Sequence, residues 1–248
     1  MSGANLLNAP SRQSKLGQRP VPGAADRAIC TVCDLALEAD HRIANHLAML
    51  SGYVRLREED LTKRGAAPTA ASVKLAFDGV RAQIEAVARL HRTLAAPQRG
   101  AGVDLGEFIH GVCAPFTSGL SGAITLSEDL QPDCVVKSDH VLPLTQIVSE
   151  VVTNAIKYSH VTGEPGSVRV RCAPLANDQV EIEISDDGHG LPVLFDPGAA
   201  SGLGFRLVRA LADQVGAEIG FDSTDKGLRF WLKVAAAGPR SPQLIAQE

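Results

Sequence analysis

Three features that would define a function class at once are missing from this sequence: a long apolar run, an excess of basic charge and a secretory leader. The 248 residues include 24 Lys and Arg against 28 Asp and Glu, a net charge of −4, so no basic field favours nucleic-acid binding. No apolar run approaches the roughly 20 residues of a membrane-spanning helix. The cations Arg12, Lys15 and Arg19 precede no apolar core, so they are not a secretory signal. We therefore expect a cytoplasmic protein without a membrane span.

Cysteine is scarce and occurs in an odd number. The five are Cys30, Cys33, Cys113, Cys134 and Cys172. An odd count without a secretory signal predicts free thiols. The CxxC pair at 30–33 lacks the second pair or flanking histidine of a zinc site and the strand-rich context of a thioredoxin motif. We interpret it as two buried thiols on a helix.

The ends of the chain differ from its middle. Residues 1–25 are rich in Gly, Pro, Ala and Ser without periodicity, so we expect a disordered tail, and 237–248 have the same character. A tail of this length is too short for a sensor domain. A separate sensor protein is therefore one possible source of any input signal.

Residues 26–96 have helical periodicity with a break near 63–69. In the first helix an apolar stripe is formed by Ile43, Leu47, Leu50 and Val54, and in the second a heptad repeat is formed by Val73, Val80, Val87 and Leu94. A two-helix hairpin cannot bury both stripes by itself. Pairing two hairpins in a homodimer would close a four-helix bundle, which we favour over a hairpin that packs on its own C-terminal half.

Residues 103–236 alternate between helical and strand periodicity. The expected helices are 103–116, 141–159 and 204–216, and the expected strands are 123–130, 167–175, 178–186, 217–223 and 227–234. This order predicts an α+β domain with helices on one face of a mixed sheet.

Three polar side chains follow one face of the expected helix 141–159. Glu150, Asn154 and Lys157 are spaced i, i+4 and i+7, so they lie on successive turns. A carboxylate, an amide and an ammonium suit a base or water site, a magnesium ligand and a phosphate contact respectively. The alternative is an ordinary solvated helix face.

Two glycine-containing turns follow. Asp186, Gly188 and Gly190 come directly after a strand, where a carboxylate can accept the adenine amine and the glycines let the backbone approach the base; a plain Asp-Gly turn is the alternative. Gly202 and Gly204 precede a helix, whose free N–H groups and dipole favour phosphate. The sequence contains neither a P-loop nor a Rossmann motif.

Taken in this order, the three motifs resemble the N, G1 and G2 boxes of the GHKL (Bergerat-fold) ATP-binding domains. The resemblance implies an α/β sandwich that binds ATP and Mg2+, with Asn154 as the metal ligand and Asp186 on adenine. The four glycines Gly188, Gly190, Gly202 and Gly204 would shape the pocket and its lid. Glu150 would act near the γ-phosphate, and Lys157 would contact phosphate.

The segment "DHRIANHLAML" at 40–50 resembles the phosphoacceptor helix of HisKA_2 and HWE histidine kinases. His41, Glu38 and Asn45 lie on the helix side opposite the apolar stripe, whereas His46 borders it, about 140° away from His41. His41 and His46 therefore cannot ligate one metal. His46 and His91 are expected to be packing residues.

The resemblance implies a two-component histidine kinase that autophosphorylates His41 and passes the phosphoryl group to an aspartate of a response-regulator receiver domain. Arg42 replaces the acid that often follows the histidine, so we take Glu38 as the candidate base. A phosphotransferase or phosphatase of the same architecture, in which Asn45 orients a water, is one alternative. A non-catalytic dimeric docking module is another.

Overall fold

The computed structural model describes most of the chain between residues 24 and 238. The described ranges are 24–62, 67–95, 102–119, 124–159, 164–191 and 203–238. The chain divides into two compact units, residues 1–45 and 46–248. Almost all of the expected tails at 1–25 and 237–248 lies outside the described ranges.

Two long helices open the chain, as the periodicity predicts. They are α1 (Ala24–Thr62) and α2 (Ala70–Ala95). Thr69 caps α2, because its Oγ1 accepts a hydrogen bond from the N–H of Ser72 at 3.1 Å. None of the helices in the described ranges combines the length and apolarity needed to cross a membrane.

Within the second unit the helical hairpin has one covered and one uncovered side. Helix α2 packs on the C-terminal half of the chain through buried small residues such as Ala82 and Ala86. The opposite side leaves large apolar side chains exposed: Leu47 by 58%, Val54 by 47%, Phe77 by 68% and Ile84 by 52%. The hairpin therefore packs on its own C-terminal half and still presents an uncovered apolar stripe.

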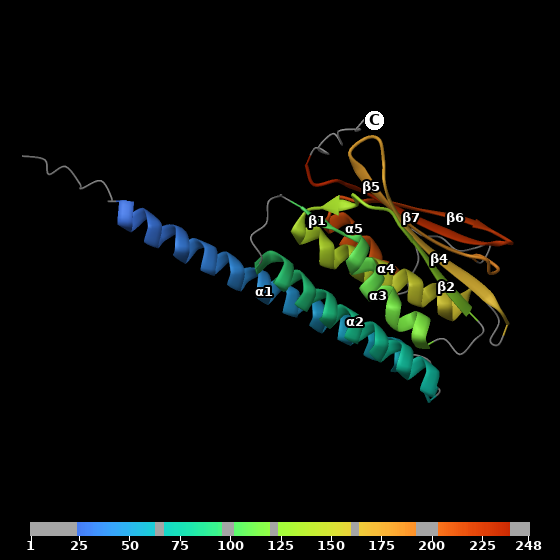
Figure 1. The fold of residues 1–248 in the computed structure, drawn as a ribbon. Helices are drawn as coiled ribbons and strands as arrows, with labels where there is room; N and C mark the ends of the chain where they lie inside the picture. The colour runs from blue at the N-terminus through green and yellow to red at the C-terminus, as the bar shows by residue number, and fades with distance from the viewer. Residues whose placement is uncertain are drawn as a thin grey trace, which may run out of the picture. The chain divides into compact units, whose positions relative to one another are not determined.

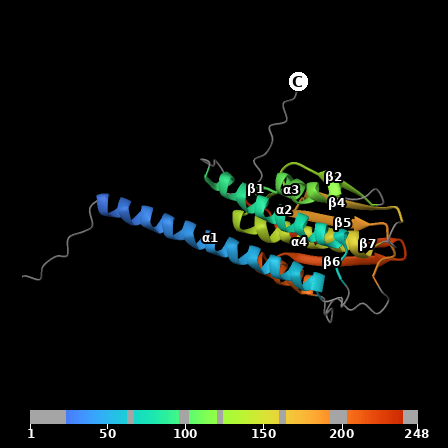
Figure 2. The same ribbon diagram turned by 90° about the horizontal axis from the view of Figure 1, so that it is seen from below.

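A five-stranded mixed sheet forms the centre of the C-terminal half (Figures 1 and 2). Its order is β2-β4-β5-β7-β6, from β2 (Ile124–Leu130), β4 (Gly166–Pro174), β5 (Gln179–Asp186), β7 (Gly227–Ala235) and β6 (Glu218–Thr224). Only β2 and β4 pair in parallel. One face is covered by α3 (Gly106–Gly119), α4 (Ser138–Tyr158) and α5 (Leu203–Gln214). This confirms the expected mixed sheet with helices on one face.

The short pair β1 (Val103–Asp104) and β3 (Val135–Val136) was not expected from the sequence. The two strands pair antiparallel in a separate two-stranded sheet. Two residues are too few for an alternating pattern to be recognised, so only the tertiary pairing shows that they are strands.

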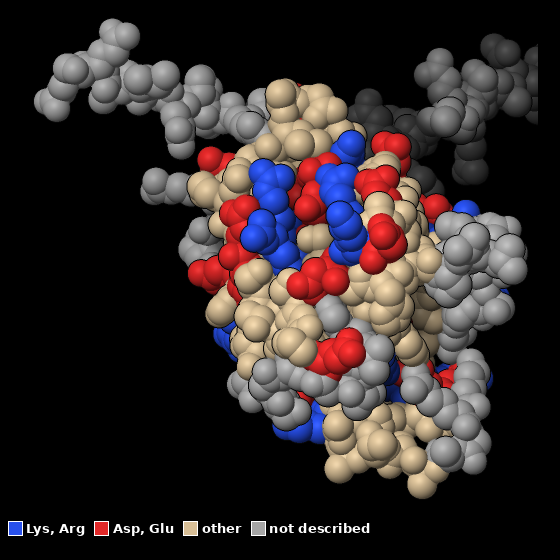
Figure 3. Space-filling view, turned by 90° about the vertical axis from the view of Figure 1, so that its right-hand side faces the viewer, with Lys and Arg blue, Asp and Glu red and all other residues tan. Residues whose placement is uncertain are grey.

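The sheet has a buried apolar face and a charged face, as period-two alternation requires. Alternate residues such as Val170, Ile182 and Leu232 are buried under the helices. On the other face Arg171 pairs with Asp129 at 3.3 Å and Arg229 with Glu183 at 2.6 Å. Figure 3 shows Lys and Arg side chains interleaved with Asp and Glu, so charges of both signs cover this surface.

The described cysteines confirm the free-thiol prediction. Cys113, Cys134 and Cys172 are buried thiols, none of which forms a disulfide with another described cysteine. They belong to the apolar core between the sheet and its helices. The CxxC cysteines lie in α1 at positions whose side chains are outside the described set.

Candidate functional site

The polar stripe on α4 is largely shielded from solvent. Glu150 is only 4% exposed, and the side chain of Lys157 is 12% exposed. Asn154 donates from Nδ2 to Glu150 Oε1 at 3.3 Å, which directs its amide oxygen away from the carboxylate. The burial excludes the solvated-face alternative and leaves three functional groups arranged along one side of a helix.

The turn after β5 is fixed around Asp186. Its Oδ1 accepts hydrogen bonds from the N–H of Gly188 at 3.0 Å and from that of Leu228 at 3.4 Å. These two bonds orient the carboxylate, as an adenine-binding group would require. A side chain at Gly227 (φ +135°) would place its Cβ 2.0 Å from the carbonyl oxygen of Asp186.

The glycines of this turn allow close backbone approach. A Cβ at Gly188 would lie 1.9 Å from the carbonyl oxygen of Ser159, the residue that follows α4. Gly190 has φ +65°, and a Cβ there would lie 2.2 Å from the carbonyl oxygen of Thr224. The turn is thus packed between the end of α4 and the end of β6, where only glycine fits without displacing backbone.

The second glycine turn contacts the same helix. A Cβ at Gly204 would lie 2.0 Å from Glu150 Oε1, so the N-terminus of α5 touches the polar stripe directly. Gly202 and most of the expected lid lie outside the described residues. Gly204 lies against Glu150 and Gly188 lies against Ser159. Glu150 and Ser159 are nine positions apart, which is about 13 Å along the axis of α4. Both described glycine turns therefore meet the same helix.

Magnesium fits this donor set. Mg²⁺ in phosphate sites is held by one or two protein oxygens, with substrate phosphates and waters as the other ligands. The amide oxygen of Asn154 would be one such ligand. In the described part of the chain no group of three or more His, Cys, Asp or Glu residues could hold a metal alone, so phosphate oxygens would have to complete the shell.

Residues 40–45 of the expected phosphoacceptor segment, which include His41, belong to the first unit. His41 and Asn45 are exposed on α1, as the helix angles predict. Glu38 also lies in α1, but its side chain is outside the described set. Its role as a base therefore stays a prediction.

His46 and His91 form a pair in the second unit. His46 is 8% exposed, and its Nδ1 lies 3.2 Å from Nε2 of His91 on α2. The two rings meet edge to face at 5.1 Å between centroids. This confirms the prediction that both are packing residues.

Comparison with known proteins assigns the family. Residues 139–238 match the family of histidine kinase-, DNA gyrase B- and HSP90-like ATPases, and residues 38–119 match the HisKA_2 histidine kinase family. The chain is 29% identical, over 212 residues, to the blue-light-activated histidine kinase 2 of Erythrobacter litoralis. The chain carries a HisKA_2 domain followed by an ATPase domain of the histidine kinase type.

The relatives that this chain matches are longer proteins. The match covers 84% of the chain and 57% of the Erythrobacter protein. The sensor histidine kinase PdtaS of Mycobacterium tuberculosis is 25% identical over 213 residues, 84% of the chain and 41% of the relative. The chain thus spans about half the length of the relatives it matches.

The fold is shared with a solved kinase. The histidine kinase domain of the Erythrobacter litoralis EL346 blue-light-activated histidine kinase superposes with a TM-score of 0.60 and 23% identity, covering 82% of this chain and 94% of that chain. Together with the ATPase family match, this confirms the expected GHKL-type fold.

Sequence reasoning missed the residues of α1 that contact the N-box residues Glu150 and Lys157. Arg57 Nη2 lies 2.6 Å from Glu150 Oε2, and Asp60 pairs with Lys157. Arg57 and Asp60 are both in the second half of α1. Their i, i+3 spacing was visible, but a charged stretch such as "RLREED" does not reveal which helix it faces.

The charge of Arg57 is maintained although its side chain is buried. Burial lowers its pKa, but Tyr53 and Glu150 favour the charged form and the net pKa is raised. Arg57 Nη2 also donates to Tyr53 Oη at 2.8 Å. Burial raises the pKa of Tyr53, so the phenol is a neutral partner for the cation.

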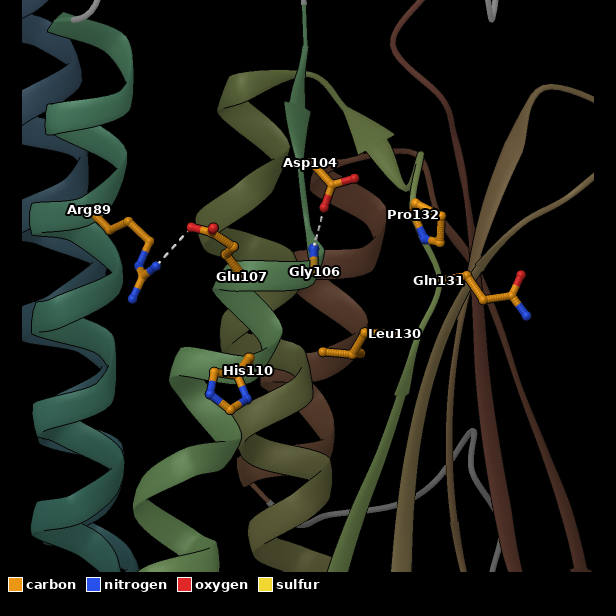
Figure 4. Close-up of a pocket in the computed structure, with 8 residues that line it drawn as sticks. All are labelled: Arg89, Asp104, Gly106, Glu107, His110, Leu130, Gln131 and Pro132. Carbon is orange, nitrogen blue, oxygen red and sulfur yellow. Dashed lines mark hydrogen bonds and ion pairs between the residues drawn. The ribbon is translucent and has the colours of Figure 1, made fainter. Parts of the chain in front are cut away.

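A surface pocket of about 490 Å³ lies away from these motifs, at the start of α3 (Figure 4). Its charged lining is paired: Arg89 Nη1 donates to Glu107 at 3.0 Å, and Asp104 accepts the N–H of Gly106 at 2.8 Å. His110, also in the lining, pairs with Glu128 at 2.8 Å. None of the motif residues lines this pocket, so it is separate from the candidate nucleotide site.

Proposed function

We propose that this histidine kinase transfers the γ-phosphoryl group of Mg-ATP to His41 and then to an aspartate of a response-regulator receiver domain. The observation that carries the proposal is the convergence of the described motif residues on α4. Gly204 contacts Glu150 at one end of the stripe, and Gly188 contacts Ser159 at the other. The fixed carboxylate of Asp186 lies in the turn that contains Gly188.

Each motif residue then has a role in nucleotide binding. Asp186 accepts the exocyclic amine of adenine, and Asn154 supplies a protein oxygen for Mg²⁺. Lys157 contacts phosphate, and Glu150 orients groups near the γ-phosphate. The glycines Gly188, Gly190, Gly202 and Gly204 admit the nucleotide to the backbone and shape the lid.

The reaction requires a neutral imidazole at His41. A ring nitrogen forms a bond to the γ-phosphorus as the bond to the β,γ-bridging oxygen breaks, and ADP leaves with that electron pair. The ring proton passes to a base, for which Glu38, one turn away, is the candidate. When bound, Mg²⁺ would neutralise phosphate charge. In the second step the N–P bond breaks as a carboxylate oxygen of the receiver aspartate bonds to phosphorus.

The uncovered stripe of the hairpin supports a homodimer. Phe77 and Ile84 on α2 are spaced by seven residues, as are Leu47 and Val54 on α1, and all four are exposed. Heptad spacing on both helices is typical of a four-helix bundle. We propose that residues 26–96 form this dimeric phosphotransfer hairpin and that residues 103–236 form the ATP-binding domain.

Autophosphorylation with γ-labelled ATP tests the phosphoacceptor. We expect label on the wild-type chain and none on His41→Gln. His110→Gln is the matched control, because His110 has a 66% exposed side chain on another helix and should leave labelling unchanged. Label retained on His41→Gln would contradict the assignment. Uptake of phosphate from a phosphorylated receiver, without labelling by ATP, would instead indicate a phosphotransferase.

Nucleotide titration tests the pocket. Asn154→Ala should weaken Mg-ATP binding by at least tenfold, the scale expected from loss of a metal ligand or its support. Asn177→Ala is the control, since Asn177 is exposed in the turn between β4 and β5. Normal Mg-ATP binding by Asn154→Ala would refute the pocket assignment.

A further inference from the structure

Helix α1 takes up both charged groups of the N-box stripe. Arg57 pairs with Glu150, and Asp60 pairs with Lys157. The signs are reversed between the helices, so each charge on α1 meets its opposite on α4. We call these four residues the latch.

The latch is partly sealed from solvent. The side chains of Arg57 and Glu150 are 4% and 5% exposed, and those of Lys157 and Asp60 are 12% and 30% exposed. The two charges of such a buried pair depend on each other, because removing one leaves the other buried without an opposite charge beside it. Among the described residues, neither the Nε of Arg57 nor the Oε2 of Glu150 has a hydrogen-bond partner, so this pair is held by charge and proximity and not by an aligned hydrogen bond.

An uncharged contact joins α1 and α4 beside the latch. Tyr53 on α1 forms a hydrogen bond with Ser149 Oγ on α4 at 2.8 Å. Helix α2 leaves room for it through Gly79, where a Cβ would lie 2.7 Å from Tyr53 Oη. Helix α1 is therefore held against α4 by a buried hydrogen bond as well as by the two ion pairs.

The latch engages α1 well beyond the phosphoacceptor segment. Within the second unit, His46 and Arg57 lie eleven positions apart on α1, about 16 Å of helix. His41 precedes His46 in the sequence. The stripe that should face ATP phosphates is therefore held by a part of α1 that carries no phosphoacceptor.

We propose that Arg57 and Asp60 determine the nucleotide affinity of this kinase, because Asp60 competes with ATP phosphates for Lys157 while Arg57 holds Glu150. This rests on the proposed phosphate-binding role of Lys157. A carboxylate and a phosphate compete for one ammonium, and the charge of Asp60 also repels the phosphates. Apparent affinity is reduced in proportion to the latched fraction. By linkage, bound nucleotide must weaken the latch by the same factor.

The first test is Asp60→Asn in the full chain, with Mg-ATP affinity measured by calorimetry. The substitution removes the charge and keeps the size. We expect Kd to fall about fivefold, at the low end of typical coupling between linked sites. Asp78→Asn is the matched control, since it breaks an ion pair with Lys74 at 2.6 Å on α2, and its Kd should equal that of the wild type.

A second variant leaves all latch charges in place. Tyr53→Phe removes the hydroxyl that bonds Ser149 and Arg57 and should lower the Kd for Mg-ATP in the same direction by a smaller factor. Amide hydrogen exchange gives the reciprocal readout. Mg-ATP should speed exchange in residues 46–62 of the wild type and have less effect in Asp60→Asn.

The outcomes separate the latch from the proposed function. If Lys157→Ala weakens Mg-ATP binding but Asp60→Asn leaves Kd unchanged or raises it, the nucleotide site stands and the latch proposal is wrong. If the wild type and Asn154→Ala are alike in failing to bind Mg-ATP, the proposed function itself fails. If exchange in residues 46–62 slows with Mg-ATP, helix α1 stabilises the bound state and the competition is refuted.

Discussion

Gly188→Ala should separate nucleotide binding from folding, because the space at this position is closed by backbone. A Cβ there would lie 1.9 Å from the carbonyl oxygen and 2.5 Å from the carbonyl carbon of Ser159. Neither atom belongs to a side chain that can rotate away. Ser159 is itself tied to α4, since its N–H donates to Ala155 O at 3.0 Å. The turn at Gly188 must therefore move by about 1.5 Å to restore ordinary contact.

The expected magnitude follows from this geometry. Overpacking typically costs about 1–3 kcal/mol, and for a domain of this size each kcal/mol lowers Tm by about 2–4 °C. Movement of the turn also lengthens the hydrogen bond from Gly188 N–H to Asp186 Oδ1, now 3.0 Å. Loss of a bond to a charged group costs about 1.5–3 kcal/mol, so ATP affinity should fall by about tenfold or more.

The assay combines calorimetric ATP titration with thermal unfolding of the same samples. Gly111→Ala is the matched control: the nearest atom to its Cβ would be Arg89 Nη2 at 3.6 Å, and Gly111 lies inside α3. Alanine favours a helix over glycine by about 0.8–1 kcal/mol, so this variant should gain stability and bind ATP normally. Wild-type ATP affinity in Gly188→Ala, with Tm unchanged, would refute the close-approach reasoning.

Three further outcomes follow. Ile84→Glu should convert a dimer to a monomer by light scattering while changing monomer stability by less than about 0.5 kcal/mol, because Ile84 is 52% exposed; an unchanged dimer mass would place the interface elsewhere. Burial raises the pKa of Cys113, and a hydrogen bond with Cys134, together with burial, raises that of Cys172. In a variant with both CxxC cysteines replaced by serine, native protein should therefore react with a disulfide reagent only as fast as it unfolds, and rapid labelling of the native protein would contradict this burial. Burial lowers the pKa of His140 below 6.5, so the stability that the neutral ring contributes is present above about pH 6.5 and is lost as pH falls through the folded-state pKa. The urea midpoint of His140→Gln should therefore change less between about pH 7 and pH 5 than that of the wild type. Identical pH profiles for the two proteins would exclude this role.

Much of the candidate site could be predicted from local pattern. Glu150, Asn154 and Lys157 share a face because helix geometry requires it, and Asp186 ends a strand whose alternation is visible in the sequence. The partners of these residues could not be predicted. Arg57 lies 93 positions from Glu150 in the sequence, and no periodicity links the two. Whether the stripe was solvated or buried depended on that packing alone.

The sequence by itself determined the elements and the family. The helices, the five main strands and the ATP-site motifs follow from local periodicity and from residue types with narrow chemical roles. Only the tertiary structure decided that Gly188 abuts Ser159, that Gly204 abuts Glu150, and that α1 neutralises the charged groups of the N box. The physical reason is that these contacts join segments far apart in the chain, whose meeting depends on how whole helices pack against the sheet.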